Sequence, residues 1–208
     1  MRSPLRAHAL FALFAAFLAS GCTTPINIGD RSAAAYAVPS QPTADLQGCH
    51  LFVASLSDAR LDPSTIGSLN ARVVHGPADP KAWLKNALGS LAKKGVAMSF
   101  AEQNTASAPG DLSVALTLQT MWVASMTTAK TGAIVIDAAY ERDGAPLKSA
   151  HYRGAESDPN WFDSADEVQG MIDSAMDQVL SQMSADLAVL CRLTLTRSER
   201  DSSAHHHA

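Results

Sequence analysis

The strongest constraint on the fold comes from alternating segments in the middle of the chain. Residues 112–119 have the sequence LSVALTLQ, in which every second side chain is a large apolar one, as on one face of a β-strand. Residues 132–141 and 147–153 also have strand character, and Asp143 and Gly144 lie between them. Asp-Gly between two such segments predicts a β-hairpin. Strands of this kind bury one face only, so other elements must cover that face.

Two amphipathic helices are expected to provide this cover. Asp79 is placed to cap the first helix, and Gly95 is placed to end it in a left-handed conformation. Ser164 and Glu167 have the spacing of a capping box at the start of the second helix, which we expect to run to about Cys191. Its apolar residues return at steps of three and four, which predicts one continuous apolar stripe.

Residues 50–58, 70–76 and 96–100 supply further candidate strands. The order is strand, possible strand, helix, strand, strand, hairpin and long helix. We therefore predict an α+β fold, with an antiparallel-dominated sheet of about five strands and two amphipathic helices packed on one face. A strictly parallel, doubly wound sheet is disfavoured, because it needs helices between most of its strands.

The N-terminal segment is typical of an export signal. An apolar run at residues 9–19 follows Arg2 and Arg6, and it is too short to cross a bilayer, which takes about 20 apolar residues. A basic start, a short apolar middle and small residues before a cleavage point are the features of a secretory signal peptide. We expect residues 1–21 to be removed from the mature chain.

Cys22 decides what kind of export this is. The stretch Leu18, Ala19, Ser20, Gly21, Cys22 resembles the lipobox of bacterial lipoproteins, in which the cysteine is acylated and becomes the first mature residue. The alternative is a soluble secreted protein whose cleavage site contains a cysteine. The lipoproteins that stay in the inner membrane usually have aspartate after the cysteine, and this chain has Thr23. The resemblance implies a lipid anchor such as palmitate and the periplasmic face of the outer membrane.

The remaining chain divides by composition. We expect a flexible tether at residues 22–48, spanning about 30 Å, then a single periplasmic domain at 49–195 and a disordered tail at 196–208. Cys49 and Cys191 lie near the two ends of that domain. An oxidising compartment favours a disulfide between them, whereas two buried thiols that never meet are the alternative.

Composition and motifs argue against several function classes. The chain has 16 Lys and Arg and 20 Asp and Glu; loss of the two arginines in residues 1–21 leaves 14 minus 20, a net charge of −6, which does not suit nucleic acid. Neither a phosphate-binding glycine loop nor a Gly-x-Ser-x-Gly elbow is present. We expect no cofactor and no metal site, and we interpret the histidines at 205–207 as adventitious ligands at most. A hydrolytic site assembled in space from Asp58, His75 or His151 and a serine stays open as an alternative.

Three residues are candidates for binding a partner. Asp58 and Arg60 lie in the turn-forming sequence SDARLDP, where a local cap and ion pair is the structural alternative. Trp161 precedes the last helix, and we consider it as an exposed aromatic anchor. The alternative is that Trp161 or its neighbour Phe162 packs on the first turn of that helix as a hydrophobic staple.

The chain resembles the YajG-like family of bacterial envelope lipoproteins and, more distantly, the auxiliary lipoproteins of ABC-type lipid transport systems. The resemblance covers most of the mature domain. Its motifs are the lipobox, the first strand with Asp58 and Arg60, Ile66 and Gly67, the helix from Trp83 and Leu84 to Gly95, the strand 112–118, Tyr152, Arg153 and Gly154 after the hairpin, and the long C-terminal helix.

The resemblance implies a membrane-tethered periplasmic domain without enzymatic activity, in some relatives an adaptor in lipid or envelope traffic. We therefore expect an outer-membrane lipoprotein that binds an envelope protein or lipid. A periplasmic hydrolase and a purely structural surface lipoprotein are the alternatives.

Overall fold

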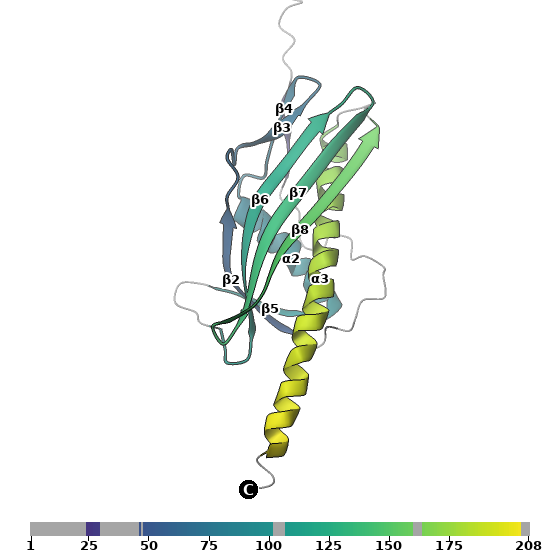
Figure 1. Cartoon of the computed structure of the whole chain (residues 1–208). Helices are drawn as coiled ribbons and strands as arrows, with labels where there is room; N and C mark the ends of the chain where they lie inside the picture. Colours follow the sequence, from purple (N-terminus) through teal and green to yellow (C-terminus); the bar gives the residue numbers. More distant parts are fainter. Residues whose placement is uncertain (1–23, 30–45, 47, 102–106, 160–163, 205–208) are drawn as a thin grey trace, which may run out of the picture.

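A computed structural model describes residues 24–29, 46, 48–101, 107–159 and 164–204, with the side chains of the last helix described through Arg192. Eight strands form one sheet, with helices beside it (Figure 1). The strands are β1 (Ile26–Asn27), β2 (His50–Asp58), β3 (Thr65–Leu69), β4 (Arg72–His75), β5 (Ala97–Phe100), β6 (Leu112–Ser125), β7 (Ala129–Arg142) and β8 (Ala145–Pro159). The helices are α2 (Pro80–Leu88), the 3₁₀ helix η2 (Gly89–Lys94) and α3 (Ala165–Ala204).

Strand β6 is the centre of the sheet. One edge pairs along its whole length with β7, and β7 pairs in turn with β8, both in antiparallel fashion. The other edge is shared by two shorter strands: β2 pairs with the first half of β6 and β3 with the end of its second half, both parallel. Beyond them lie β5 on the side of β2, and β4 with β1 on the side of β3.

This topology corrects the predicted sheet. The hairpin is confirmed, since β7 and β8 meet at Asp143 and Gly144, both with positive φ. The expected five strands are wrong, because the sheet has eight. The expected antiparallel dominance is also wrong: β1 with β4, β2 with β5, β2 with β6 and β3 with β6 are parallel pairs. The chain leaves β2, forms β3, β4 and α2, and returns in parallel as β5, a crossover that strand patterns alone do not specify.

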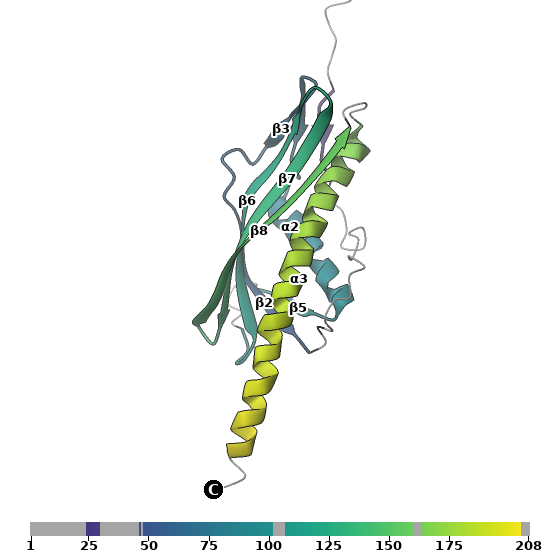
Figure 2. The same ribbon diagram turned by 45° about the vertical axis from the view of Figure 1, so that its right-hand side comes forward.

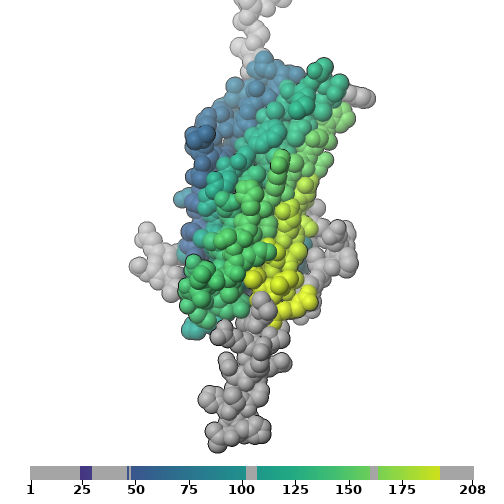
Figure 3. All heavy atoms as spheres, viewed as in Figure 1, coloured from purple at the N-terminus to yellow at the C-terminus, as the bar shows by residue number. Residues whose placement is uncertain are grey.

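The helices close the core. Asp79 accepts hydrogen bonds from the backbone N–H groups of Lys81 and Ala82 at the start of α2, and Gly95 ends η2 in the left-handed conformation, as predicted. One continuous hydrophobic cluster contains side chains of α2, α3 and the sheet. Helix α3 runs alongside β8 (Figure 2), and the two lie against each other on the face seen in Figure 3. Within the described residues, no helix combines the length and apolar character needed to cross a lipid bilayer.

Helix α3 lies unusually close to β8. A Cβ atom added at Gly154 would be 1.7 Å from the carbonyl oxygen of Ala175, so only glycine fits at this crossing. Next to it, Gln178 and Gln182 donate from Nε2 to the carbonyl oxygens of Ala155 and Arg153 at 2.8 and 2.7 Å. Each glutamine also accepts from the N–H of the same residue. The two side chains therefore pair with the edge of β8 as another strand would.

A chain of hydroxyl groups also joins α3 to the hairpin. The hydroxyl groups of Tyr140 and Tyr152 are 3.0 Å apart, and Tyr152 donates to Asp186 on α3 at 2.6 Å. Lys148 pairs with the other oxygen of this carboxylate. Burial raises the pKa of both tyrosines, which therefore stay neutral. The network satisfies polar atoms that the packing of α3 would otherwise leave without partners.

The N-terminal part of the expected tether is folded. Ile26 and Asn27 form β1 on the edge of β4, and Ile26, Ile28 and Leu46 are buried in the core. The prediction of one flexible tether over 22–48 is therefore wrong for residues 24–29, because alternate isoleucines dock on the sheet. The expected Cys49–Cys191 disulfide is present. Helix α3 continues to Ala204, past the end near Cys191 that we expected, and its last turns extend beyond the sheet (Figure 1).

The close approach at Gly154 predicts a strong effect of one methyl group. We expect Gly154→Ala to lower the free energy of unfolding by at least about 2 kcal/mol, because α3 and β8 must separate to admit the Cβ. Urea denaturation measures this. Gly170→Ala on α3 is the control: its Cβ meets nothing within 4 Å, so helix propensity should raise stability by up to about 1 kcal/mol. Equal effects of the two changes would contradict the packing described for α3.

Candidate functional site

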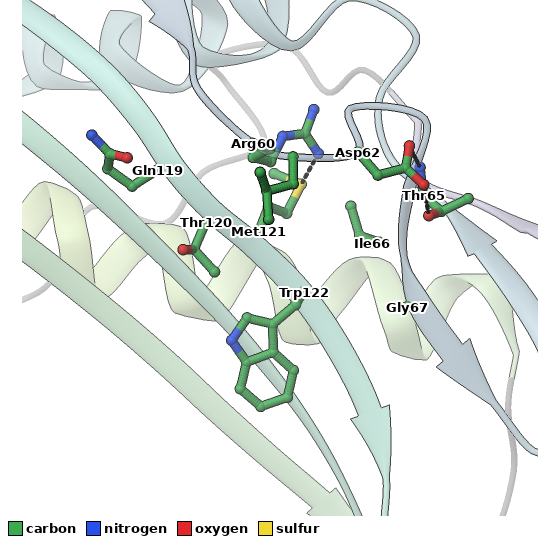
Figure 4. Close-up of a pocket in the computed structure, with 10 residues that line it drawn as sticks. Arg60, Asp62, Thr65, Ile66, Gly67, Gln119, Thr120, Met121 and Trp122 are labelled. Carbon is green, nitrogen blue, oxygen red and sulfur yellow. Dashed lines mark hydrogen bonds between the residues drawn. The ribbon is translucent and has the colours of Figure 1, made fainter.

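A pocket lies where β2 and β3 leave part of the edge of β6 uncovered. The paired residues of β6 end at Leu118 on the side of β2 and resume at Val123 on the side of β3. The loop from β2 to β3 crosses this gap and borders an open, shallow pocket of about 370 Å³. Figure 4 shows the residues that line it. The lining residues are Arg60, Leu61, Asp62, Thr65, Ile66, Gly67, Gln119, Thr120, Met121 and Trp122.

Asp58 and Arg60 hold the loop in place. The Nε and one terminal nitrogen of Arg60 donate to the two carboxylate oxygens of Asp58, each at 2.8 Å, and the same terminal nitrogen donates to the carbonyl oxygen of Pro63. The Arg60 side chain is only 4% exposed. The hydrogen bonds from Arg60 lower the pKa of Asp58, so the pair is ionised at neutral pH. The local ion pair therefore accounts for both residues, and neither presents a free charge to a partner.

Asp62 fixes the far side of the loop. Its carboxylate accepts from the hydroxyl groups of Ser64 and Thr65 and from their backbone N–H groups. The hydrogen bond from the Ser64 hydroxyl is the largest cause of a lowered pKa at Asp62. With both carboxylates bonded within the loop, Leu61 between them is left fully exposed.

A β-bulge brings Trp122 to the uncovered face of the sheet. Leu118 pairs with Ile136 and Thr120 with Val135, so β6 has one extra residue at Gln119. Before the bulge the even-numbered residues point into the core; after it Met121 and Val123 do, and Trp122 points outward. Figure 4 shows Trp122 directed away from Arg60.

The residues in register with Trp122 are small and uncharged. The register places Ala133 of β7 next to Trp122 and Ala155 of β8 next to Ala133. Trp122 is half-buried, and Ala133 beside it is only 1% exposed. Together, Trp122, Leu61 and the pocket between them form what we term the loop–bulge site.

Four polar residues form a row across the same face. Ser57, Thr117, Asp137 and His151 are neighbours in register on β2, β6, β7 and β8. Ser57 bonds to Thr117 at 2.8 Å, and Asp137 bonds to His151 at 2.5 Å and accepts from Gln119. In a hydrolytic triad the histidine lies between the hydroxyl and the carboxylate. Here the aspartate lies between the hydroxyl and the histidine, so the row lacks the order that activates a nucleophile.

The structure does not bring the candidate hydrolytic residues together. Asp58 lies on β2, three strands from His151 on β8, which at about 4.8 Å per strand separates them by about 14 Å. His75 on β4 bonds through Nδ1 to the carbonyl oxygen of Ser64. Each of the three side chains thus has its own partner.

Several other predicted positions lie outside the described residues, namely Cys22, Trp161 and the histidines at 205–207. Across the described ranges, no group of three or more His, Cys, Asp or Glu side chains is placed to hold a metal ion. The roles predicted for Cys22 and Trp161 stay predictions.

Trp122 and Leu61 are not among the site residues predicted from the sequence. Perfect alternation from Leu112 would carry position 122 into the core, and the bulge that reverses this leaves no mark in the side-chain pattern. One feature of the sequence could have indicated that Leu61 is exposed. It is a large apolar residue between Asp-Ala-Arg and Asp-Pro, in a segment otherwise typical of a turn.

Comparisons with known proteins support the fold. No protein-family model and no curated protein matches the chain. The structure is similar to protein XCC0632 of Xanthomonas campestris, family-model DUF330, with a TM-score of 0.51 and 14% identity over 84% of this chain and 98% of that one.

Weaker similarities reach two bacterial lipoproteins. A minor lipoprotein of Acinetobacter baumannii gives a TM-score of 0.40 at 13% identity, over 65% of this chain and 92% of that one. Lipoprotein GNA1162 of Neisseria meningitidis gives 0.38 at 13% identity, over 66% and 99%. Of these three, the similarity to the Xanthomonas protein is the one close enough to show a shared fold, and at 14% identity it shows the fold alone.

The Asp58–Arg60 pair generates a prediction about pH. We expect Asp58→Asn to lower the free energy of unfolding by about 2 kcal/mol at pH 7, because Arg60 loses two charge-assisted hydrogen bonds. The folded pKa of Asp58 lies below the unfolded value of about 3.9, so the stabilisation is complete above that pH. It is lost as the pH falls through the folded pKa.

Urea unfolding of both proteins from pH 7 downward measures this difference. The gap between them should begin to close below about pH 4. The double variant Asp58→Asn with Arg60→Met should lose less than the sum of the single changes, because the unpaired guanidinium is gone. A gap that stays the same from neutral to strongly acidic pH would show that the ion pair does not stabilise the loop.

Proposed function

We propose that this chain is a lipid-anchored protein of the bacterial cell envelope, attached through Cys22 at the periplasmic face of the outer membrane. Its domain binds another envelope component, protein or lipid, and carries out no catalysis. The proposal places it with the envelope lipoproteins that the YajG-like family exemplifies, in a role such as an adaptor in lipid or envelope traffic.

The disulfide is the observation that carries the location. Cys49 and Cys191 are bridged across 142 residues, and such bonds persist in oxidising compartments such as the periplasm. A lipobox cysteine ahead of a disulfide-bonded domain is the arrangement expected of an exported lipoprotein. Thr23 after Cys22 supports the outer membrane over the inner one.

The loop–bulge site supports the binding role. Trp122 is a large aromatic group on an uncovered sheet face, and Leu61 is fully exposed at the rim of the pocket. Aromatic side chains next to a pocket are typical anchors of protein interfaces. The Asp58–Arg60 ion pair and the hydrogen bonds to Asp62 order the β2–β3 loop before a partner binds. Binding therefore loses less conformational entropy of the loop.

Fatty-acid labelling tests the anchor. Cells that express the chain are grown with an alkyne-bearing palmitate analogue, and the purified protein is reacted with an azide dye. We expect label on the natural chain and loss of at least about nine-tenths of it in Cys22→Ala, because the thiol and the new amino end carry the lipid. Ser20→Thr keeps a small hydroxyl residue before the cleavage site and serves as the control. Label that survives in Cys22→Ala would place the lipid on another residue, and a natural chain without label would exclude the anchor.

Site-specific crosslinking tests the binding role. A photoreactive amino acid replaces Leu61 or, as the control, Val189, which is 59% exposed on α3. In intact cells we expect a discrete adduct from position 61 that is reduced at least about threefold by Trp122→Ala, because both residues contact the same partner. Equal adducts at 61 and 189, or none at 61 across growth conditions, would favour a purely structural lipoprotein.

A further inference from the structure

Three segments meet at one end of the sheet, and we term this surface the N-terminal end. They are residues 24–25, the turn of Asn70 and Ala71 between β3 and β4, and the turn at 126–128 between β6 and β7 (Figures 1 and 2). The Nε of Arg72 donates to the carbonyl oxygen of Thr24 at 2.9 Å. The N–H of Asn70 donates to the hydroxyl of Ser125 at 3.4 Å. These bonds make the three segments one surface.

The position of β1 limits how far this surface can be from the lipid. Cys22 precedes Thr24 by two residues, and a fully extended chain spans about 3.5 Å per residue. The acylated residue therefore lies within about 7 Å of Thr24. A flexible tether across 22–48 would have allowed the domain any orientation, whereas a docked β1 does not.

We propose that the N-terminal end lies flat against the bilayer, with the β6–β7 turn in the lipid head-group region. This inference rests on the proposed lipid at Cys22. The long axis of the sheet then stands away from the membrane surface, and the last turns of α3 point away from it.

The chemistry of the N-terminal end suits a lipid surface. Met126, at the start of the β6–β7 turn, is 70% exposed, and Val73 on β4 is 43% exposed. Residues 70–71 and 125–128 are Asn-Ala and Ser-Met-Thr-Thr, so the two turns themselves carry no charge. The carboxylate of Asp158, near the end of β8, lies at the same end of the sheet, separated from β6 by β7 and in register with Lys130 of β7. Ser68 of β3 pairs with Val73 of β4 on one side and with Ala124 of β6 on the other. Val73 and the turn with Met126, which follows β6, therefore lie on either side of β3. An apolar residue at the tip of an uncharged turn inserts without the desolvation of an ionised group.

The opposite end provides a matched control position. Leu147 on β8 is 42% exposed and lies close to the β7–β8 turn at Asp143 and Gly144. The 14 residues of β7 separate the two turns by about 45 Å. An end-on domain keeps Leu147 outside the bilayer, while a domain lying on its side brings both positions to it.

Fluorescence in vesicles tests the orientation. The full lipidated chain is purified with Met126→Cys or Leu147→Cys, labelled with the environment-sensitive dye NBD, and reconstituted into vesicles of phosphatidylethanolamine and phosphatidylglycerol. Cys49 and Cys191 are bridged and a lipidated Cys22 has no thiol, so only the new cysteine reacts. We expect brominated lipids to quench NBD at position 126 at least about threefold more strongly than at position 147.

The outcomes separate this inference from the proposed function. If the chain floats with the vesicles but NBD at 126 is quenched no more than at 147, the lipid anchor holds and the end-on orientation is overturned. If NBD at 126 shifts to the blue without quenching by brominated lipids, a second copy or another protein covers this end, and the lipid surface is the wrong occupant. If the chain does not float and Cys22 reacts with the dye, both the anchor and the orientation are overturned.

Discussion

The shared edge of β6 determines how the rest of the molecule is arranged. A strand of 14 residues offers more edge than β2 or β3 can pair with alone, so both dock on it and a gap is left between them. The bulge at Gln119 lies in this gap, where β6 has no neighbour on that side to hold its register. The pocket, the outward turn of Trp122 and the loop fixed by Asp58 and Arg60 all follow from this one mismatch in strand length.

Helix α3 closes what would otherwise be an exposed edge. A long outer strand such as β8 presents unpaired N–H and C=O groups, which invite pairing with other chains. The side chains of Gln178 and Gln182 form hydrogen bonds with the backbone N–H and C=O groups of two residues on that edge. Gly154 lets the backbone of α3 come near enough to β8 for these bonds to form. The stability of the hairpin and its protection against aggregation thus depend on the same close crossing. Because this edge is occupied, we place partner binding on the open face of the sheet.

Local sequence patterns predicted most helices and strands, but they did not predict which distant strands pair. The hairpin at Asp143 and Gly144, the cap at Asp79 and the capping box at Ser164 depend on residues a few positions apart, so the sequence shows them directly. The parallel pairing of β2 with β6 joins segments about 60 residues apart, and no side-chain pattern specifies that neighbour. Two alternating apolar residues, Ile26 and Ile28, are too few to predict strand β1 from the sequence. In the candidate site, the sequence indicated the local ion pair of Asp58 and Arg60. It did not predict the outward direction of Trp122, because the bulge shifts the register of β6 by one residue.

The place of the loop–bulge site along the sheet limits which partners can reach it. Trp122 is three residues from Ser125, about 10 Å along β6 from the N-terminal end. With that end against the bilayer, a ligand at the pocket lies next to the lipid head groups, within reach of molecules held in the same membrane. A partner confined to that membrane would meet the site at a higher effective concentration than a soluble one, so it would need less contact area around Trp122 and Leu61 for the same occupancy. If Cys22 carries the proposed lipid, the short link at residues 22–24 would favour membrane-held partners as well as set the orientation, because it fixes the height of the site above the bilayer.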